Sequence, residues 1–103
     1  MIEQLISLEL LHKTGSQFFF YRTSAGAEID LLIIRGADKI GFEIKSAQSA
    51  HPRDRTTLAA ERAAGIITRG YVVYMGNRRY PAAEGIEAIG AEEIIMKAAA
   101  GRI

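Results

Sequence analysis

Three charged residues with metal and phosphate chemistry, Asp30, Glu43 and Lys45, lie in stretches that otherwise read as β-strands. The two stretches are rich in β-branched and aromatic residues, and they span residues 27–34 and 40–46. The four residues between them, 35–38, form a predicted turn. The sequence therefore predicts an antiparallel hairpin with charges at positions where apolar side chains are expected.

Alternation of side chains across each strand predicts two faces for this hairpin. The apolar face carries Ile29, Leu31, Ile33, Ile40, Phe42 and Ile44, and the other carries Glu28, Asp30, Leu32, Ile34, Gly41, Glu43 and Lys45. A tight turn, in which Gly36 is free to adopt a positive φ, places Asp30 across from Glu43 and Glu28 across from Lys45. Facing Cβ atoms lie about 4.5–5.5 Å apart. Two carboxylates at that distance repel each other unless a cation or a proton lies between them.

A hard divalent cation with oxygen ligands satisfies this arrangement, so the sequence predicts a Mg²⁺ or Mn²⁺ site. Asp30 and Glu43 are the predicted ligands, and Glu3, from an upstream helix, could hold the metal or a second water. Lys45 would orient the attacking water and offset charge on the phosphorus, which are requirements of phosphodiester hydrolysis. The alternative is a plain cross-strand ion pair between Glu28 and Lys45, worth about 0.2–1 kcal/mol.

The composition predicts a single small domain of 103 residues with a net charge of +1. Cysteine is absent, which excludes disulfides, thiolate zinc sites and cysteine nucleophiles. His12 and His51 fall in different predicted elements, so a zinc site is not expected. Neither a signal peptide nor an apolar run of membrane-spanning length is visible, and we expect a cytoplasmic protein with no membrane partner.

The remaining elements complete an α-β-β-β-α-β order, with a possible β-α appendage. Predicted helices span residues 1–13, 54–64 (with Asp54 as N-cap) and 91–100, predicted strands span 17–23 and 71–75, a turn spans 23–26, and a short edge strand spans 85–89. The helix between the third and fourth strands predicts that the fourth strand runs parallel to a neighbour. The fold class is therefore α/β, a mixed β-sheet flanked by helices.

Charged residues also occur outside the hairpin, in the first helix and in the later loops. Glu9 lies inside the apolar arc of the first helix, where we expect a solvated side chain. The arginines of the later loops predict a phosphate-binding rim around the hairpin, or else scattered surface charge: Arg53, Arg55, Arg78 and Arg79.

The segments EQLISLELL, YRTSAGAEIDLLI and FEIKS, in this order and with these gaps, resemble the PD-(D/E)XK, or restriction-endonuclease-like, superfamily. The chain is similar to the domain of unknown function that follows the ATP-binding module in many bacterial and archaeal AAA+ ATPases, and also to archaeal Holliday-junction resolvases. The resemblance covers residues 3–89. It implies a restriction-endonuclease-like αβββαβ core and, as partner, DNA, including branched DNA.

Position by position, the resemblance implies that Glu3 is the acidic residue of the first helix and Asp30 the central metal ligand. Glu43 and Lys45 match the catalytic pair, whereas Ile29 replaces the proline of the superfamily's name. Arg22 and Glu28 match recurring positions of the ATPase-linked family, and Arg22 would meet a phosphate or pair with Glu28.

Two functions remain open at this point. The first is a Mg²⁺-dependent DNA endonuclease, and the second is a catalytically silent accessory domain that binds DNA or a protein. No GxxxxGK[ST] loop occurs, so the resemblance implies that an AAA+ ATPase module precedes Met1 in a longer natural chain. Many nucleases of this type form homodimers, but no dimer surface is identifiable in the sequence.

Overall fold

The computed structural model describes residues 1–22, 26 and 28–103, so most of the predicted turn at 23–26 lies outside the described residues. The helices are α1 (Ile2–His12), the 3-10 helix η1 (Pro52–Arg55), α2 (Thr56–Ala63) and α3 (Ala91–Ala99). The strands are β1 (Gln17–Arg22), β2 (Glu28–Arg35), β3 (Asp38–Ile44), β4 (Arg69–Tyr74), β5 (Tyr80–Ala83) and β6 (Ile86–Gly90). They form one mixed sheet in the order β1-β2-β3-β4-β6-β5.

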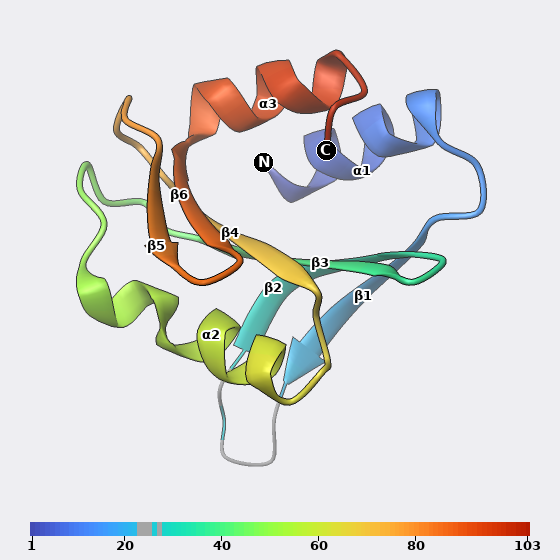
Figure 1. The fold of residues 1–103 in the computed structure, drawn as a ribbon. Helices are drawn as coiled ribbons and strands as arrows, with labels where there is room; N and C mark the ends of the chain where they lie inside the picture. The colour runs from blue at the N-terminus through green and yellow to red at the C-terminus, as the bar shows by residue number, and fades with distance from the viewer. Residues whose placement is uncertain (23–25, 27) are drawn as a thin grey trace.

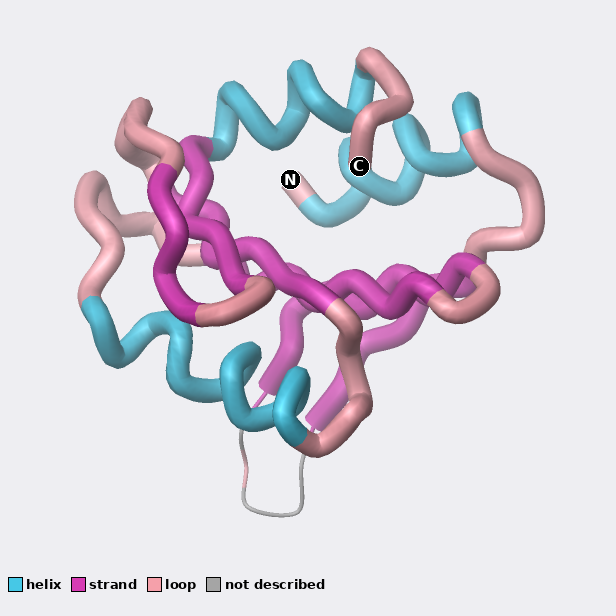
Figure 2. The backbone as a smooth tube through the Cα atoms, viewed as in Figure 1, coloured by secondary structure: helices cyan, strands magenta, loops and turns pink. Residues whose placement is uncertain are grey.

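The sheet separates two helical layers (Figure 1). Helices α1 and α3 pack on one face over a core that includes Leu5, Phe42 and Ile94, and α2 covers the other face over a smaller core around Leu58. Gly41 permits the close approach of α2, because a Cβ at this position would lie 3.1 Å from Leu58 Cδ2. Colouring by secondary structure shows the same layers (Figure 2). None of the helices in the described residues is long and apolar enough to cross a membrane.

The predicted order of helices and strands is confirmed, and so is the parallel fourth strand, since β4 runs parallel to β3. The edge-strand prediction for residues 85–89 is wrong, because β6 pairs with β4 on one side and with β5 on the other. The edge strand on this side of the sheet is β5, which contains Pro81. Proline cannot donate to a ladder and is tolerated at an edge, which explains why this strand is not recognisable from its sequence.

Asp54 is not the N-cap of α2, as the sequence predicted. Residues 52–55 form the separate 3-10 helix η1, and Arg55 is the N-cap of α2. The Asp54 carboxylate instead accepts a hydrogen bond from the backbone N–H of His51 at 2.8 Å. Asp54 therefore closes a turn ahead of α2, and α2 begins after Arg55, one residue later than predicted.

The predicted register of the central hairpin is confirmed in the paired part of its strands. The pairs run from Arg35–Asp38 at the turn to Leu31–Phe42, and Gly36 has a positive φ of 62°. The two-residue turn at 36–37 connects the strands directly. The backbone pairing of β2 with β3 stops at Leu31–Phe42, one step before the residues that the sequence placed opposite each other, Asp30 and Glu43.

The unbroken alternation predicted for β2 is wrong at one point. Phe19 pairs with Leu32 but Tyr21 pairs with Ile29, so β2 has one residue more than β1 between these pairs. Such a β-bulge shifts the side chains beyond it to the other face. Ile29 accordingly packs with the α2-side core, whereas Leu31 packs with the core under α1 and α3. Asp30 lies within the bulge.

Glu9 is buried, with 5% of its surface exposed, which contradicts the expected solvated side chain. Its carboxylate accepts hydrogen bonds from Ser16 Oγ at 2.7 Å and from the Arg35 guanidinium. Arg35 also donates to the carboxylate of Asp38 at 3.1 Å and to the Ile103 carbonyl at 2.8 Å. These bonds join α1, the hairpin and the C-terminal residues, so Glu9 has a structural role.

We expect Arg35→Met to destabilise the protein by about 3 kcal/mol, because it leaves the buried Glu9 carboxylate without its cation. Chemical denaturation measures this change in the free energy of unfolding. The double variant Glu9→Leu/Arg35→Met should recover most of the loss, since no buried charge remains. Arg22→Met is the matched control: its exposed ion pair with Glu28 contributes about 0–1 kcal/mol. Equal losses in both single variants would contradict the structural role of Glu9.

Candidate functional site

The carboxylate of Asp30 takes the place of a ladder bond where β2 and β3 separate. Its Oδ2 accepts a hydrogen bond of 2.7 Å from the backbone N–H of Ile44. The next N–H along the chain, that of Lys45 directly after β3, points the other way and donates to the Val73 carbonyl of β4. Because successive N–H groups of a strand point to opposite neighbours, the Ile44 N–H faces β2 and needs a partner there. The bulge at Asp30 supplies that partner from a side chain.

Glu43 and Lys45 form an ion pair on the next strand, with 3.6 Å between Lys45 Nζ and Glu43 Oε1. Only 13% of the Glu43 side chain is exposed. Burial raises the pKa of Glu43, Lys45 opposes this effect, and the carboxylates of Asp30 and Asp54 add to it. Asp30 and Glu43 are thus close enough for their charges to interact, and one ammonium partly offsets two neighbouring carboxylates.

Asp54 is a further carboxylate of this region, which the sequence predicted only as a helix cap. It lies in η1, which precedes α2 on the same side of the sheet as the Leu58 core, and its charge raises the pKa of Glu43. Its Oδ2 is already engaged with the His51 N–H. The sequence around Asp54 indicated only the start of a helix and contains no sign that its charge acts on Glu43.

The predicted third metal ligand, Glu3, is exposed in the first turn of α1. Among the described residues, no three His, Cys, Asp or Glu side chains lie together in a group that could hold a metal ion. The carboxylates of Asp30 and Glu43 are oxygen donors of the kind that Mg²⁺ prefers, and Mg²⁺ commonly keeps several waters with one or two protein carboxylates. The two donors therefore suit a Mg²⁺ ion, and the structure does not bring Glu3 into a group with them.

The arginines predicted to bind nucleic acid lie in two separate places. Arg22 ends the edge strand β1 and pairs with Glu28, one of the two alternatives left open by the sequence. Arg53 and Arg55 lie exposed on η1, across the sheet from α1. The alternative ion pair between Glu28 and Lys45 is not formed, because each residue pairs with a different partner.

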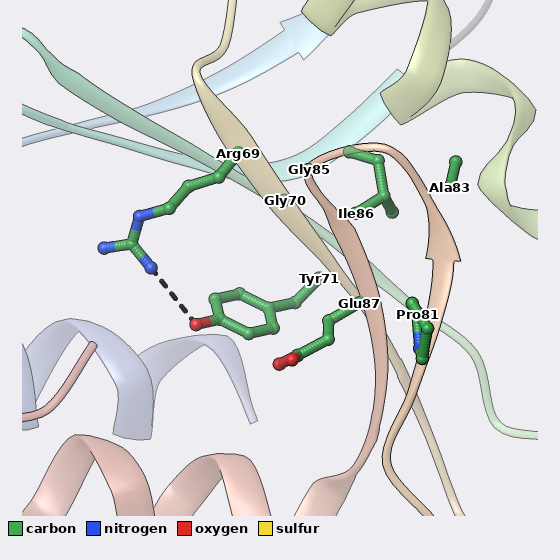
Figure 3. A pocket seen from close by; sticks show the side chains of 8 residues that line it. All are labelled: Arg69, Gly70, Tyr71, Pro81, Ala83, Gly85, Ile86 and Glu87. Carbon is green, nitrogen blue, oxygen red and sulfur yellow. Dashed lines mark hydrogen bonds between the residues drawn. The ribbon is translucent and has the colours of Figure 1, made fainter.

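A cavity of about 310 Å³ lies at the opposite end of the parallel strands, where β4 and β6 begin. Arg69, Tyr71 and Glu87 project to the same side there (Figure 3). Arg69 donates to Tyr71 Oη at 3.1 Å and to the Asp38 carboxylate at 3.0 Å. The bond from Arg69 to Asp38 lowers the pKa of Asp38. Arg69 of this cavity therefore has hydrogen-bonding partners in Tyr71 and Asp38.

Comparison with known proteins yields one finding. A family model described as "Domain of unknown function (DUF4143)" matches residues 1–94. No curated protein and no solved structure matches the chain. The matched range contains the whole hairpin and each residue discussed above as a candidate ligand.

We expect Glu43→Gln to raise the melting temperature at neutral pH. A raised pKa in the folded state means that the folded protein favours protonated Glu43, so ionisation costs stability as the pH rises. Glutamine mimics the protonated form. The gain should therefore be absent below about pH 4, near the unfolded-state pKa of glutamate, and grow as the pH rises through the raised pKa.

Thermal melts of both proteins between acidic and neutral pH measure this difference. Glu84→Gln is the matched control, because Glu84 is 91% exposed and its replacement should change stability by less than about 0.5 kcal/mol at any pH. A Glu43→Gln protein that is less stable than the wild type at pH 7 would show that ionised Glu43 is a stabilising group.

Proposed function

We propose that this chain, which belongs to the DUF4143 family, is a metal-dependent nuclease domain that hydrolyses phosphodiester bonds of DNA. The observation that carries the proposal is the convergence of Asp30, Glu43 and Lys45 at the point where β2 and β3 separate. The family description assigns no activity, and the chemistry of these three residues is what supports the proposal.

Asp30 and Glu43 are the proposed metal ligands, and the cation is Mg²⁺ or Mn²⁺. Such a cation supplies positive charge that favours deprotonation of water and offsets charge on the phosphoryl oxygens. The raised pKa of Glu43 supports this role, because neighbouring carboxylates disfavour a further negative charge and a cation between them relieves the repulsion. Glu43 is only 13% exposed and its pKa is raised, and carboxylates of this kind are typical of functional sites.

Lys45 is the proposed cationic group that contacts the scissile phosphate. Its ammonium lies 3.6 Å from Glu43, and 36% of its side chain is exposed, so it can reach a ligand without leaving the pair. Its ammonium would present positive charge to the phosphate. Glu3, in the first turn of α1, is the proposed outer acidic residue and would act on the metal through a water.

The order of elements supports a restriction-endonuclease-like identity for the core. A helix, three antiparallel strands, a second helix and a parallel fourth strand occur in this order. In this proposal the domain lies beside an AAA+ ATPase module in a longer chain. It cuts DNA, including branched DNA, and a homodimer would allow it to cut two strands. Arg53 and Arg55 on η1 are the proposed phosphate contacts on the α2 side.

The second candidate is a silent binding module of the same ATPase. The specific observation in its favour is that the described residues contain no group of three potential metal ligands. In such a module the pKa of Glu43 would remain raised, and Lys45 would serve only as its partner. This candidate requires binding of DNA without cleavage.

Cleavage of linear and branched DNA in the presence of Mg²⁺ or Mn²⁺ tests the proposal. We expect metal-dependent cutting by the wild type and a loss of at least about 100-fold in Asp30→Asn and in Lys45→Ala, because each removes charge that acts on the transition state. Glu84→Gln, an exposed acid in the turn before β6, should cut like the wild type.

Circular dichroism spectra of the variants establish that each one folds. Folded Asp30→Asn and Lys45→Ala proteins that still cut would refute the assignment of the site. Wild-type protein that binds DNA in a salt-sensitive manner but cuts none of the substrates would establish the binding module instead.

A further inference from the structure

Strand β1 exposes an aromatic ring at the edge of the sheet. Among the described strands it pairs only with β2, and its residue Phe20 is 78% exposed. A phenylalanine this exposed contributes little to burial, and an edge strand with aromatic side chains favours unwanted association unless the surface has a use. Phe20 is therefore an unexplained feature of the fold.

The position of Phe20 relates it to the candidate site. It lies between the pairs Phe19–Leu32 and Tyr21–Ile29, and so faces the bulge that contains Asp30. Phe20 and Asp30 also line the same hollow, of about 290 Å³, together with Ile2, Tyr21, Arg22, Glu28 and Ile29. The exposed ring is thus an immediate neighbour of the proposed metal ligand, on the next strand.

Arg22 adds a cation to this hollow. Its side chain is 73% exposed, and it pairs with Glu28, which also lines the hollow. A guanidinium has five N–H donors, so contact with one carboxylate leaves donors for a phosphate. An exposed ring beside an exposed guanidinium is the combination with which proteins hold an unpaired base and its phosphate.

We propose that Phe20 stacks on an unpaired base and that the substrate of this site is therefore single-stranded DNA or a single-stranded branch of a duplex. The identification of the ligand as DNA rests on the proposed function above. Base pairs inside a duplex are covered on both faces by their neighbours, so only an unpaired base offers a face to the ring. Stacking on Phe20 would bring the adjoining phosphate beside Arg22 and towards Asp30.

Fluorescence anisotropy with a labelled single-stranded oligothymidylate and a labelled duplex tests this inference in EDTA and in Ca²⁺. We expect tighter binding of the single strand, and a loss of about tenfold in Phe20→Leu, which keeps an apolar side chain but removes the ring. Phe20→Tyr keeps the ring and should bind like the wild type. Leu11→Ala is the control, because Leu11 is an apolar residue 75% exposed on α1.

The outcomes separate this inference from the proposed nuclease activity. Ring-dependent binding of the single strand without cleavage in Mg²⁺ would uphold the inference and refute the nuclease. Metal-dependent cleavage with equal affinities for Phe20→Leu and the wild type would uphold the nuclease and refute the inference. Absence of single-strand binding would also refute the inference. Concentration-dependent self-association that Phe20→Leu abolishes would refute it as well, because the ring would then belong to a contact between copies of the chain.

Discussion

The separation of β2 and β3 is the constraint on which the candidate site depends. Up to Leu31–Phe42 the two strands are joined by backbone pairs, and beyond this point a side chain, Asp30, satisfies the N–H of Ile44. A buried N–H must find an acceptor, so the carboxylate is held in place by a requirement of the backbone itself. The β-bulge between β1 and β2 supplies the extra residue. Glu43 and Lys45 lie on either side of Ile44, and their positions follow from this bond.

The carboxylates at the two ends of the hairpin have opposite electrostatic surroundings. At the turn end, Arg35 and Arg69 surround Asp38, and Arg35 also neutralises the buried Glu9, so negative charge there is matched by cations. The pKa of Asp38 is lowered as a result, mainly by its hydrogen bonding with Arg69. At the other end, where β2 and β3 separate, the pKa of Glu43 is raised, because burial and the neighbouring carboxylates have a larger effect on it than the single lysine, Lys45. The first arrangement stabilises the fold, whereas the second costs stability and leaves charge available for a ligand.

Sequence patterns predicted most of the elements and the hairpin register because these follow from local chemistry: Gly36 in the turn, β-branched strands, and the helix that makes β4 parallel to β3. They failed where tertiary contacts decide. The bulge at Asp30 depends on pairing with β1, and no single strand contains a signal for it. The burial of Glu9 depends on Arg35, 26 residues away. The sequence identified the charged residues of the candidate site, but neither the Asp30–Ile44 bond nor the effect of Asp54 on Glu43 could be derived from it.

Paramagnetic broadening of the protein's NMR signals by Mn²⁺ tests most directly whether a cation binds between the strands. Broadening falls steeply with distance from the ion, so a specific site affects the nearest amides at the lowest Mn²⁺ concentration. Our account predicts that the amide signals of Asp30, Glu43, Ile44 and Lys45 disappear first and that excess Mg²⁺ restores them. Broadening that begins instead at Glu92 and Glu93 on α3, or that spreads evenly over surface carboxylates, would contradict it.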